Sequence, residues 1–199
     1  AGNGAMLSGA SAEFREFIEL LGMPFLTTPG GRGILAETHP LALGVCGLYR
    51  TKVGKAVQSA ADLLITVGSR NEAFETHSWK DFPKGAKFVQ VDIAPFEIGR
   101  NWLPDIGILG DARLVLKQLV EALKARVKGG TDYEAMLRVK EIMKAKADFE
   151  KEVEAECLAD VTPVPAKRAV YELTRVFGRN TIIVSENGSQ DSWAYCFPY

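Results

Sequence analysis

The stretch AADLLITVGSR, residues 60–70, decides the fold of this chain. Its centre, residues 63–67, is a run of apolar and β-branched side chains, and Gly68 ends the run. Such a run is too short to cross a membrane and is typical of a strand that is buried on both faces of a parallel sheet. Residues 52–61 are predicted to form a helix that leads into it. We therefore expect a crossover helix followed by a central strand.

Two further apolar runs follow, FVQVDI at residues 88–93 and IGILGD at residues 106–111. Helices that alternate with short strands ending in Gly, Asp or Arg indicate an α/β fold, with a parallel, doubly wound (Rossmann-like) sheet flanked by helices. In such sheets ligands bind beyond the carboxyl ends of the strands. The candidate site is therefore expected along that edge.

Composition excludes several classes of function. The 199 residues are 47% hydrophobic and 25% charged, which is ordinary for a globular protein. A net charge of −1 gives no electrostatic support for binding to nucleic acid or to an anionic membrane surface. The three cysteines, Cys46, Cys157 and Cys196, fit no zinc spacing. A reducing cytoplasm is the simplest setting for them, so a cytoplasmic location is expected.

The N-terminal third is expected to alternate turns, helix and strand. AGNGA at residues 1–5 is typical of a strand-to-helix turn without the apolar strand that should precede it, so we expect a chain that begins inside a larger protein or lacks its first strand. Residues 11–21 have helical periodicity, with Ser11 as the expected N-cap and Gly22 as the stop. A strand over residues 23–28 should follow.

The remaining elements divide the chain into three parts. Residues 34–51 are expected to be mostly loop, and Asp111 should cap a helix over residues 112–127. These belong to a central nucleotide-binding-like domain, residues 1–127. Residues 128–165 are predicted to be a helical linker, whose Lys- and Glu-rich part is one long solvated helix or two consecutive helices. Residues 166–199, with a helix and a strand at 181–185, should begin a second, incomplete α/β unit.

Glycine-containing turns at the predicted strand ends are the main chemical signal. They occur at residues 2–4, 29–33, 68–70 and 110–111, and Asp92 ends a further strand. Exposed amides and Arg70 could face phosphates, and Asp92 could accept from a ribose hydroxyl or an adenine amine. No turn is a complete G-x-G-x-x-G fingerprint, so the glycines could equally serve only to form turns.

Other chemistries have weaker support. His39 and His77, the only histidines, have no ligand partner at metal-binding spacing, and they are expected to be a loop residue and a surface residue. Ser69 is not part of a G-x-S-x-G elbow, which argues against a hydrolase triad.

An ordered set of segments resembles the central domain of thiamine-diphosphate-dependent enzymes of the acetolactate synthase and benzoylformate decarboxylase superfamily. The matching segments are AGNGA, FREFIELLGMPFLTT, GGRGILAETHPLALGVCG, AADLLITVGSR, FVQVDIAPFEIGRN and GDARLVLKQLVEAL, and the resemblance resumes over residues 163–199 with IIVSENGSQDSWA. It implies a six-stranded parallel sheet in the central domain. That domain holds FAD in acetolactate synthases, ADP or the CoA end in oxalyl-CoA decarboxylases, and nothing in several decarboxylases.

The resemblance also implies site residues. The positions where a flavin or ADP would be contacted are Gly2, Asn3, Gly4, Thr28, Gly44, Val45, Gly68, Arg70, Asp92, Ile93 and Asp111. The positions that match the loop near the thiamine diphosphate are Gly188, Ser189 and Gln190. Departures from the flavin-binding pattern include Cys46, where histidine is usual, and they argue against a flavin and leave an ADP-like ligand or an empty crevice open.

For the complete enzyme, the resemblance implies thiamine diphosphate with Mg²⁺, a small 2-oxoacid substrate, and a homodimer or homotetramer. The family's catalytic glutamate lies in an N-terminal domain that this sequence does not include. No catalytic residue is therefore assigned, and the chain by itself is expected to be inactive. Two alternatives stay open: a stand-alone nucleotide-binding module, and a structural module that bridges catalytic domains and binds nothing.

Overall fold

The computed structural model describes residues 1–127, 132–177, 181, 182 and 184. The strands are β1 (Phe25–Thr27), β2 (Ala42–Val45), β3 (Leu63–Val67), β4 (Lys87–Asp92) and β5 (Ile106–Leu109). The α-helices are α1 (Asn3–Leu7), α2 (Ser11–Leu21), α3 (Lys52–Ser59), α4 (Ala112–Lys124), α5 (Leu137–Cys157) and α6 (Ala166–Val176). Short 3₁₀ helices are η1 (Pro29–Gly31), η2 (Gly47–Tyr49) and η3 (Tyr133–Ala135).

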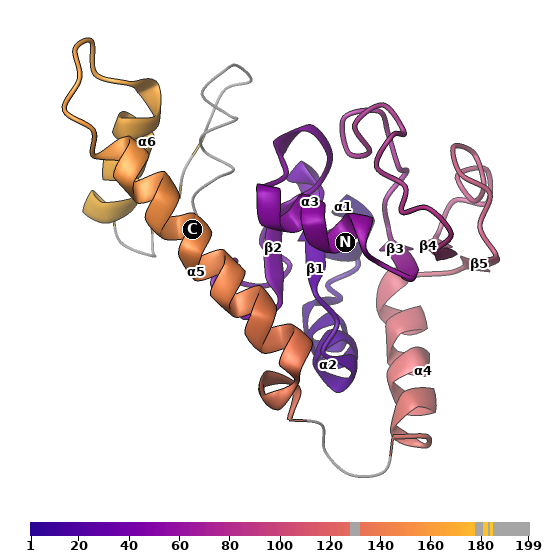
Figure 1. Ribbon diagram of the computed structural model, residues 1–199. Coiled ribbons are helices and arrows are strands. Elements are labelled where there is room, and N and C mark those ends of the chain that lie inside the picture. The colour runs from indigo at the N-terminus through magenta and orange to yellow at the C-terminus, as the bar shows by residue number, and fades with distance from the viewer. Residues whose placement is uncertain (128–131, 178–180, 183, 185–199) are drawn as a thin grey trace.

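All paired strands are parallel and are flanked by helices, which confirms the predicted α/β class. The strands lie in two groups, one with the order β1-β2 and the other with the order β3-β4-β5. Figure 1 shows the N-terminus between these two groups, next to β1 on one side and β3 on the other. The predicted sheet is therefore present, but it is interrupted between β1 and β3.

The prediction that residues 63–67 are buried on both faces is wrong. Only Val67 of β3 is buried, at 2% exposure, and Leu63 is 40% exposed. The neighbouring β4 carries the buried positions instead, with Phe88 and Val91 almost completely covered. The reason is the interruption of the sheet: β3 pairs with β4 along one edge, whereas its other edge borders a cavity.

The prediction that residues 34–51 are mostly loop missed β2. This strand pairs with β1, with Phe25 opposite Ala42 and Thr27 opposite Val45. Gly44, with φ of +87°, lies within it, and the register shifts between the two pairs. A glycine inside a short strand often marks a bulge, and it broke the apolar run by which the strand could have been recognised in the sequence.

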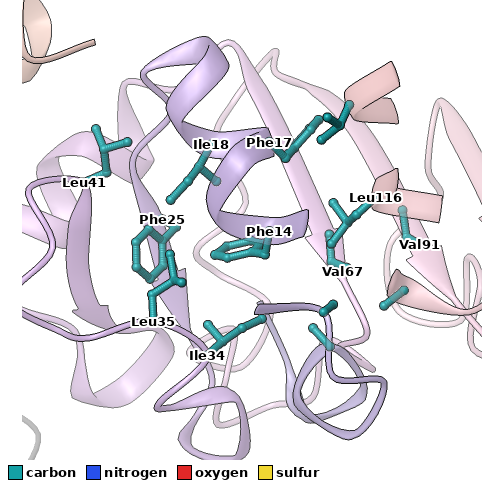
Figure 2. Close-up of a cluster of buried hydrophobic side chains, with 14 of the residues drawn as sticks. Phe14, Phe17, Ile18, Phe25, Ile34, Leu35, Leu41, Val67, Val91 and Leu116 are labelled. Carbon is teal, nitrogen blue, oxygen red and sulfur yellow. The ribbon is translucent and has the colours of Figure 1, made fainter. Parts of the chain in front are cut away.

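The main core lies under α2, which begins and ends as predicted. Its apolar stripe buries Phe14, Phe17 and Ile18, and Gly22 adopts the left-handed C-cap conformation. Ser11 is not the cap, because the N-cap position is Ala10 and no side chain caps this helix. Figure 2 shows the α2 side chains between Phe25 of β1 and the residues of β3, β4 and α4. The helix therefore holds the two strand groups together.

The Lys- and Glu-rich segment forms one continuous helix, α5, rather than two. Its apolar stripe is buried at Val139 and Ile142, while most of its surface is exposed. The Lys146 ammonium donates to the carbonyl of His39 at 3.0 Å, and burial lowers the pKa of this lysine. The helix is thus anchored to the central domain along one side.

The C-terminal part is described only as far as α6 and four further residues, 177, 181, 182 and 184. The buried Tyr171 of α6 packs on Cys157 at the end of α5. The predicted strand at 181–185 is not found in its described residues, Thr181, Ile182 and Val184, and its other residues lie outside the described part. None of the helices in the described part is both long and apolar enough to span a membrane.

Candidate functional site

The loops that follow β1, β3, β4 and β5 meet at the carboxyl edge of the strands, where the site was expected. The amide of Gly2 donates to Val67 O and the amide of Gly4 donates to Gly68 O, both at 2.9 Å. The Gly68 amide in turn donates to Val91 O at 2.8 Å. The AGNGA turn is therefore held directly against the turn after β3, and that turn against the end of β4.

The glycines at this edge let backbones approach one another. A Cβ at Gly2 would lie 2.3 Å from Gly68 O, and one at Gly4 would lie 2.9 Å from Gly68 Cα. A Cβ at Gly31 would lie 2.3 Å from Ala1 O. Only glycine fits such contacts without a shift of the main chain. Turn packing alone therefore accounts for these three glycines, whether or not a ligand approaches them.

Buried polar side chains stiffen the same loops. Thr28 Oγ1 accepts from the Gly31 amide at 3.1 Å, which caps η1. Ser69 Oγ donates to Glu75 Oε2 at 2.8 Å and accepts from the Asn71 amide at 3.2 Å. These bonds give the loops after β1 and β3 one defined shape, as a preformed binding site requires.

Cys46 lies at the end of β2, where its amide donates to Thr27 O at 2.8 Å. Burial raises the pKa of its thiol to about 12. The thiol therefore stays protonated at neutral pH and is a poor nucleophile. Gly44 and Val45 precede it in β2, with Val45 fully buried.

Arg70 offers a cationic group that can change partners. Its Nη2 lies 2.7 Å from Glu72 Oε1, and the two side chains are 62% and 48% exposed. Exposed pairs of this kind contribute only about 0–1 kcal/mol, so a phosphate could compete with the carboxylate of Glu72. The Asn101 side chain donates to Arg70 O at 2.8 Å, which fixes the backbone beneath the guanidinium.

Asp92 ends β4 beside this turn and is buried. Its Oδ1 accepts from the Ala94 amide at 2.9 Å, while Oδ2 has no partner among the described residues. Ile93, the next residue, is 69% exposed. Oδ2 therefore remains available as a hydrogen-bond acceptor at the end of β4.

Asp111 has a structural role that the sequence predicted. Its Oδ1 accepts from the Leu114 amide at 3.1 Å, which caps α4. The preceding Gly110 amide donates to Asp92 O at 2.9 Å, so the end of β5 lies beside the end of β4. Asn3, at the start of α1, lies under the loop after β1, where a Cβ at Gly30 would be 3.1 Å from the Asn3 Cβ.

Sequence reasoning missed a buried polar network beneath this edge. The Gln90 side chain donates to Glu97 O and accepts from the Gly99 amide, both at 2.9 Å. The carboxylate of the buried Glu97 pairs with Arg100 at 2.8 Å. Together these bonds fold the loop after β4 back onto Gln90 of that strand. The signal available in the sequence was the single glutamine inside the apolar run FVQVDI.

The remaining candidates do not add to the site. Gly188, Ser189 and Gln190 lie outside the described residues. His39 is a loop residue as predicted, but it is buried, with Nε2 3.0 Å from Glu19 Oε1. Within the described ranges, no group of three or more His, Cys, Asp or Glu side chains is placed to hold a metal ion.

Comparison with known families shows to which family this chain belongs. The model of the thiamine pyrophosphate enzyme central domain matches residues 1–119. The chain belongs to this family. The resemblance inferred from the ordered segments is therefore confirmed, and membership implies thiamine diphosphate as the family's cofactor.

Curated relatives of this chain extend the match. It is 34% identical over 199 residues to a probable acetolactate synthase large subunit of Methanococcus aeolicus, covering 97% of this chain and 33% of the relative. A probable acetolactate synthase large subunit of Methanocaldococcus jannaschii is also 34% identical, with 97% and 32% covered. A glyoxylate carboligase of Escherichia coli O157:H7 is 31% identical, with 94% and 31% covered. The chain thus spans about a third of the length of these relatives.

Proposed function

We propose that this chain is the central part of a thiamine-diphosphate-dependent synthase or decarboxylase of 2-oxoacids, and that its carboxyl edge binds FAD or ADP. The similarity to acetolactate synthases and to a glyoxylate carboligase supports the first part. On this proposal the complete protein is a cytoplasmic homodimer or homotetramer. Thiamine diphosphate, bound together with Mg²⁺, would supply an electron sink for making or breaking a carbon–carbon bond beside a carbonyl.

The observation that carries nucleotide binding is the placement of Arg70 and Asp92. Arg70 follows β3 and Asp92 ends the adjacent parallel strand β4, and glycine turns and hydrogen bonds hold this edge in place. Arg70 would hold phosphate oxygens in exchange for its weak pair with Glu72. Asp92 would accept from a ribose hydroxyl or an adenine amine through its free oxygen. A cation and an acceptor at neighbouring strand ends suit a nucleotide.

Calorimetric titration of the chain with FAD, ADP, CoA and NAD in parallel tests the nucleotide site. We expect saturable micromolar binding and a Kd that rises about 10- to 100-fold in Arg70→Ala, because a hydrogen bond to a charged group contributes about 1.5–3 kcal/mol. Arg15→Ala is the matched control, since Arg15 is an exposed arginine of α2 that pairs with Glu19. Its Kd should not change.

The outcomes separate the ligands. Binding heat with FAD alone favours a flavin site like that of the acetolactate synthases. Binding heat with both ADP and CoA favours an acyl-CoA type of site. No heat with any of the four nucleotides contradicts the site and leaves a structural module. Equal losses in the Arg70 and Arg15 variants would also contradict it.

The reaction is tested separately, in a protein that carries this chain together with pyrimidine- and diphosphate-binding domains. We expect turnover of a 2-oxoacid that depends on added thiamine diphosphate and Mg²⁺ and stops when either is removed. Pyruvate and glyoxylate are the first substrates to assay, because the named relatives are acetolactate synthases and a glyoxylate carboligase. Failure with every 2-oxoacid tried would overturn this part of the proposal alone.

A further inference from the structure

Arg70 lies beyond the last point at which the sheet holds the turn after β3. The pairing of β3 with β4 has its last pair at Val67 and Val91, and one further bond runs from the Gly68 amide to Val91 O at 2.8 Å. The Arg70 side chain itself is exposed, and its printed partner, Glu72, lies on the same turn. The place of the guanidinium therefore depends on how the main chain beneath it is held.

One side chain from the loop after β4 holds that main chain. The Asn101 amide donates to Arg70 O at 2.8 Å and to Asn71 O at 3.0 Å. An amide group has two hydrogens, so each carbonyl can receive one of them. In the part of the chain that the structure describes, the other hydrogen bonds of residues 69–71 are all made within residues 69–79 of the same loop. Asn101 is therefore the hydrogen-bonded tie between this turn and the loop after β4.

Asn101 is in turn held in place by β4. Gln90 of this strand is 1% exposed, and it donates to Glu97 O and accepts from the Gly99 amide, both at 2.9 Å. These two bonds fix the loop just before Asn101. Asp92 lies two residues further along the same strand. One strand thus carries Asp92 directly and, through the loop that contains Asn101, holds the turn after β3.

We propose that Asn101 is a positioning residue of the nucleotide site. By fixing the backbone at residues 70 and 71, its amide holds the Arg70 guanidinium at a set place relative to Asp92. A ligand with a nucleoside and a diphosphate, as FAD and ADP both have, then meets the acceptor and the cation together. A side chain on a fixed main chain also loses less freedom when the ligand binds. This inference rests on the proposed nucleotide site.

A double-mutant cycle between Asn101 and Arg70 tests the inference. ADP and FAD are titrated by calorimetry into the full chain, into Asn101→Ala, into Arg70→Ala and into the variant with both changes. We expect Asn101→Ala to raise the Kd about 10-fold, because the guanidinium must then be ordered as the ligand binds. The double variant should have the Kd of Arg70→Ala to within about twofold, because Asn101 acts on the ligand only through Arg70.

Gln58→Ala is the matched control, because it removes a bond of the same kind from the same loop. The Gln58 side-chain amide donates to Asp81 O at 3.0 Å, further along the loop than Arg70. This control should leave the Kd unchanged. Circular dichroism spectra show whether each variant folds. If Asn101→Ala does not fold, Asn101→Ser replaces it, since a hydroxyl keeps one donor and should raise the Kd by a smaller factor.

The outcomes separate this inference from the proposed function. Equal Kd values for the parent and Asn101→Ala overturn the inference and leave the nucleotide site standing. The inference is also overturned if Asn101→Ala raises the Kd as much in the Arg70→Ala background as in the parent, because Asn101 would then shape the whole edge. If the parent binds neither ADP nor FAD, the proposed site is contradicted and the inference fails with it.

Discussion

Gly68→Ala should lower the free energy of unfolding by about 3 kcal/mol, from two effects at one position. Gly68 has φ of +60°, and a residue with a Cβ in the left-handed region costs about 1–2 kcal/mol. The added Cβ would also lie 2.5 Å from Ala5 N and 2.7 Å from Gly4 C, and overpacking of this kind costs about 1–3 kcal/mol. Urea unfolding followed by circular dichroism measures the loss.

Gly85→Ala is the matched control for this prediction. Gly85 has φ of +78°, but a Cβ there would meet no atom within 4 Å. The free energy of unfolding of the control should therefore fall by only about 1–2 kcal/mol, because alanine is strained in this backbone conformation. Equal losses in the two variants would contradict the close contact between the AGNGA turn and the turn after β3. A larger loss in Gly68→Ala would show that this contact stabilises the candidate site.

Local patterns in the sequence predicted most elements of this fold. The periodic apolar residues of α2 and the capping aspartate of α4 each set a helix, and the strands around residues 63–67 and 88–93 were found because their apolar runs are continuous. β2 was missed because Gly44 interrupts its run. The gap beside β3 was missed because burial depends on what lies along the other edge of the strand, which the strand's own residues do not encode.

The candidate site was predictable as a place but not as a set of contacts. Asp92 and Arg70 were singled out because they end apolar runs, and the parallel topology puts them at one edge. The bonds of Gln90 to the loop after β4 could not be derived, because they join residues whose distance depends on how that loop folds back. Likewise, glycine is needed at residues 2 and 68 because the AGNGA turn and the turn after β3 touch there, and these two segments are far apart in the sequence.

Phe88→Ala should be the most destabilising single truncation in the part of the molecule that supports the candidate site. Phe88 is 1% exposed in β4, and its ring meets Phe82 at 5.5 Å and Trp102 at 6.1 Å between centroids, edge to face in both cases. Truncation of a buried phenylalanine to alanine costs about 3–5 kcal/mol, because transfer and cavity terms add. The loss is measured by urea unfolding followed by tryptophan fluorescence.

Phe96→Ala controls for the loss of an aromatic ring as such. Phe96 follows the same strand but is 74% exposed. Its truncation should therefore change the free energy of unfolding by no more than about 0.5 kcal/mol. If Phe88→Ala does not fold, Phe88→Leu replaces it in the test. This variant retains most of the apolar volume, so its free energy of unfolding should fall by less. Similar losses at Phe88 and Phe96 would contradict the burial of Phe88. Because Phe82 and Trp102 belong to the segments that follow β3 and β4, loosening of this cluster should also weaken nucleotide binding at Arg70 and Asp92.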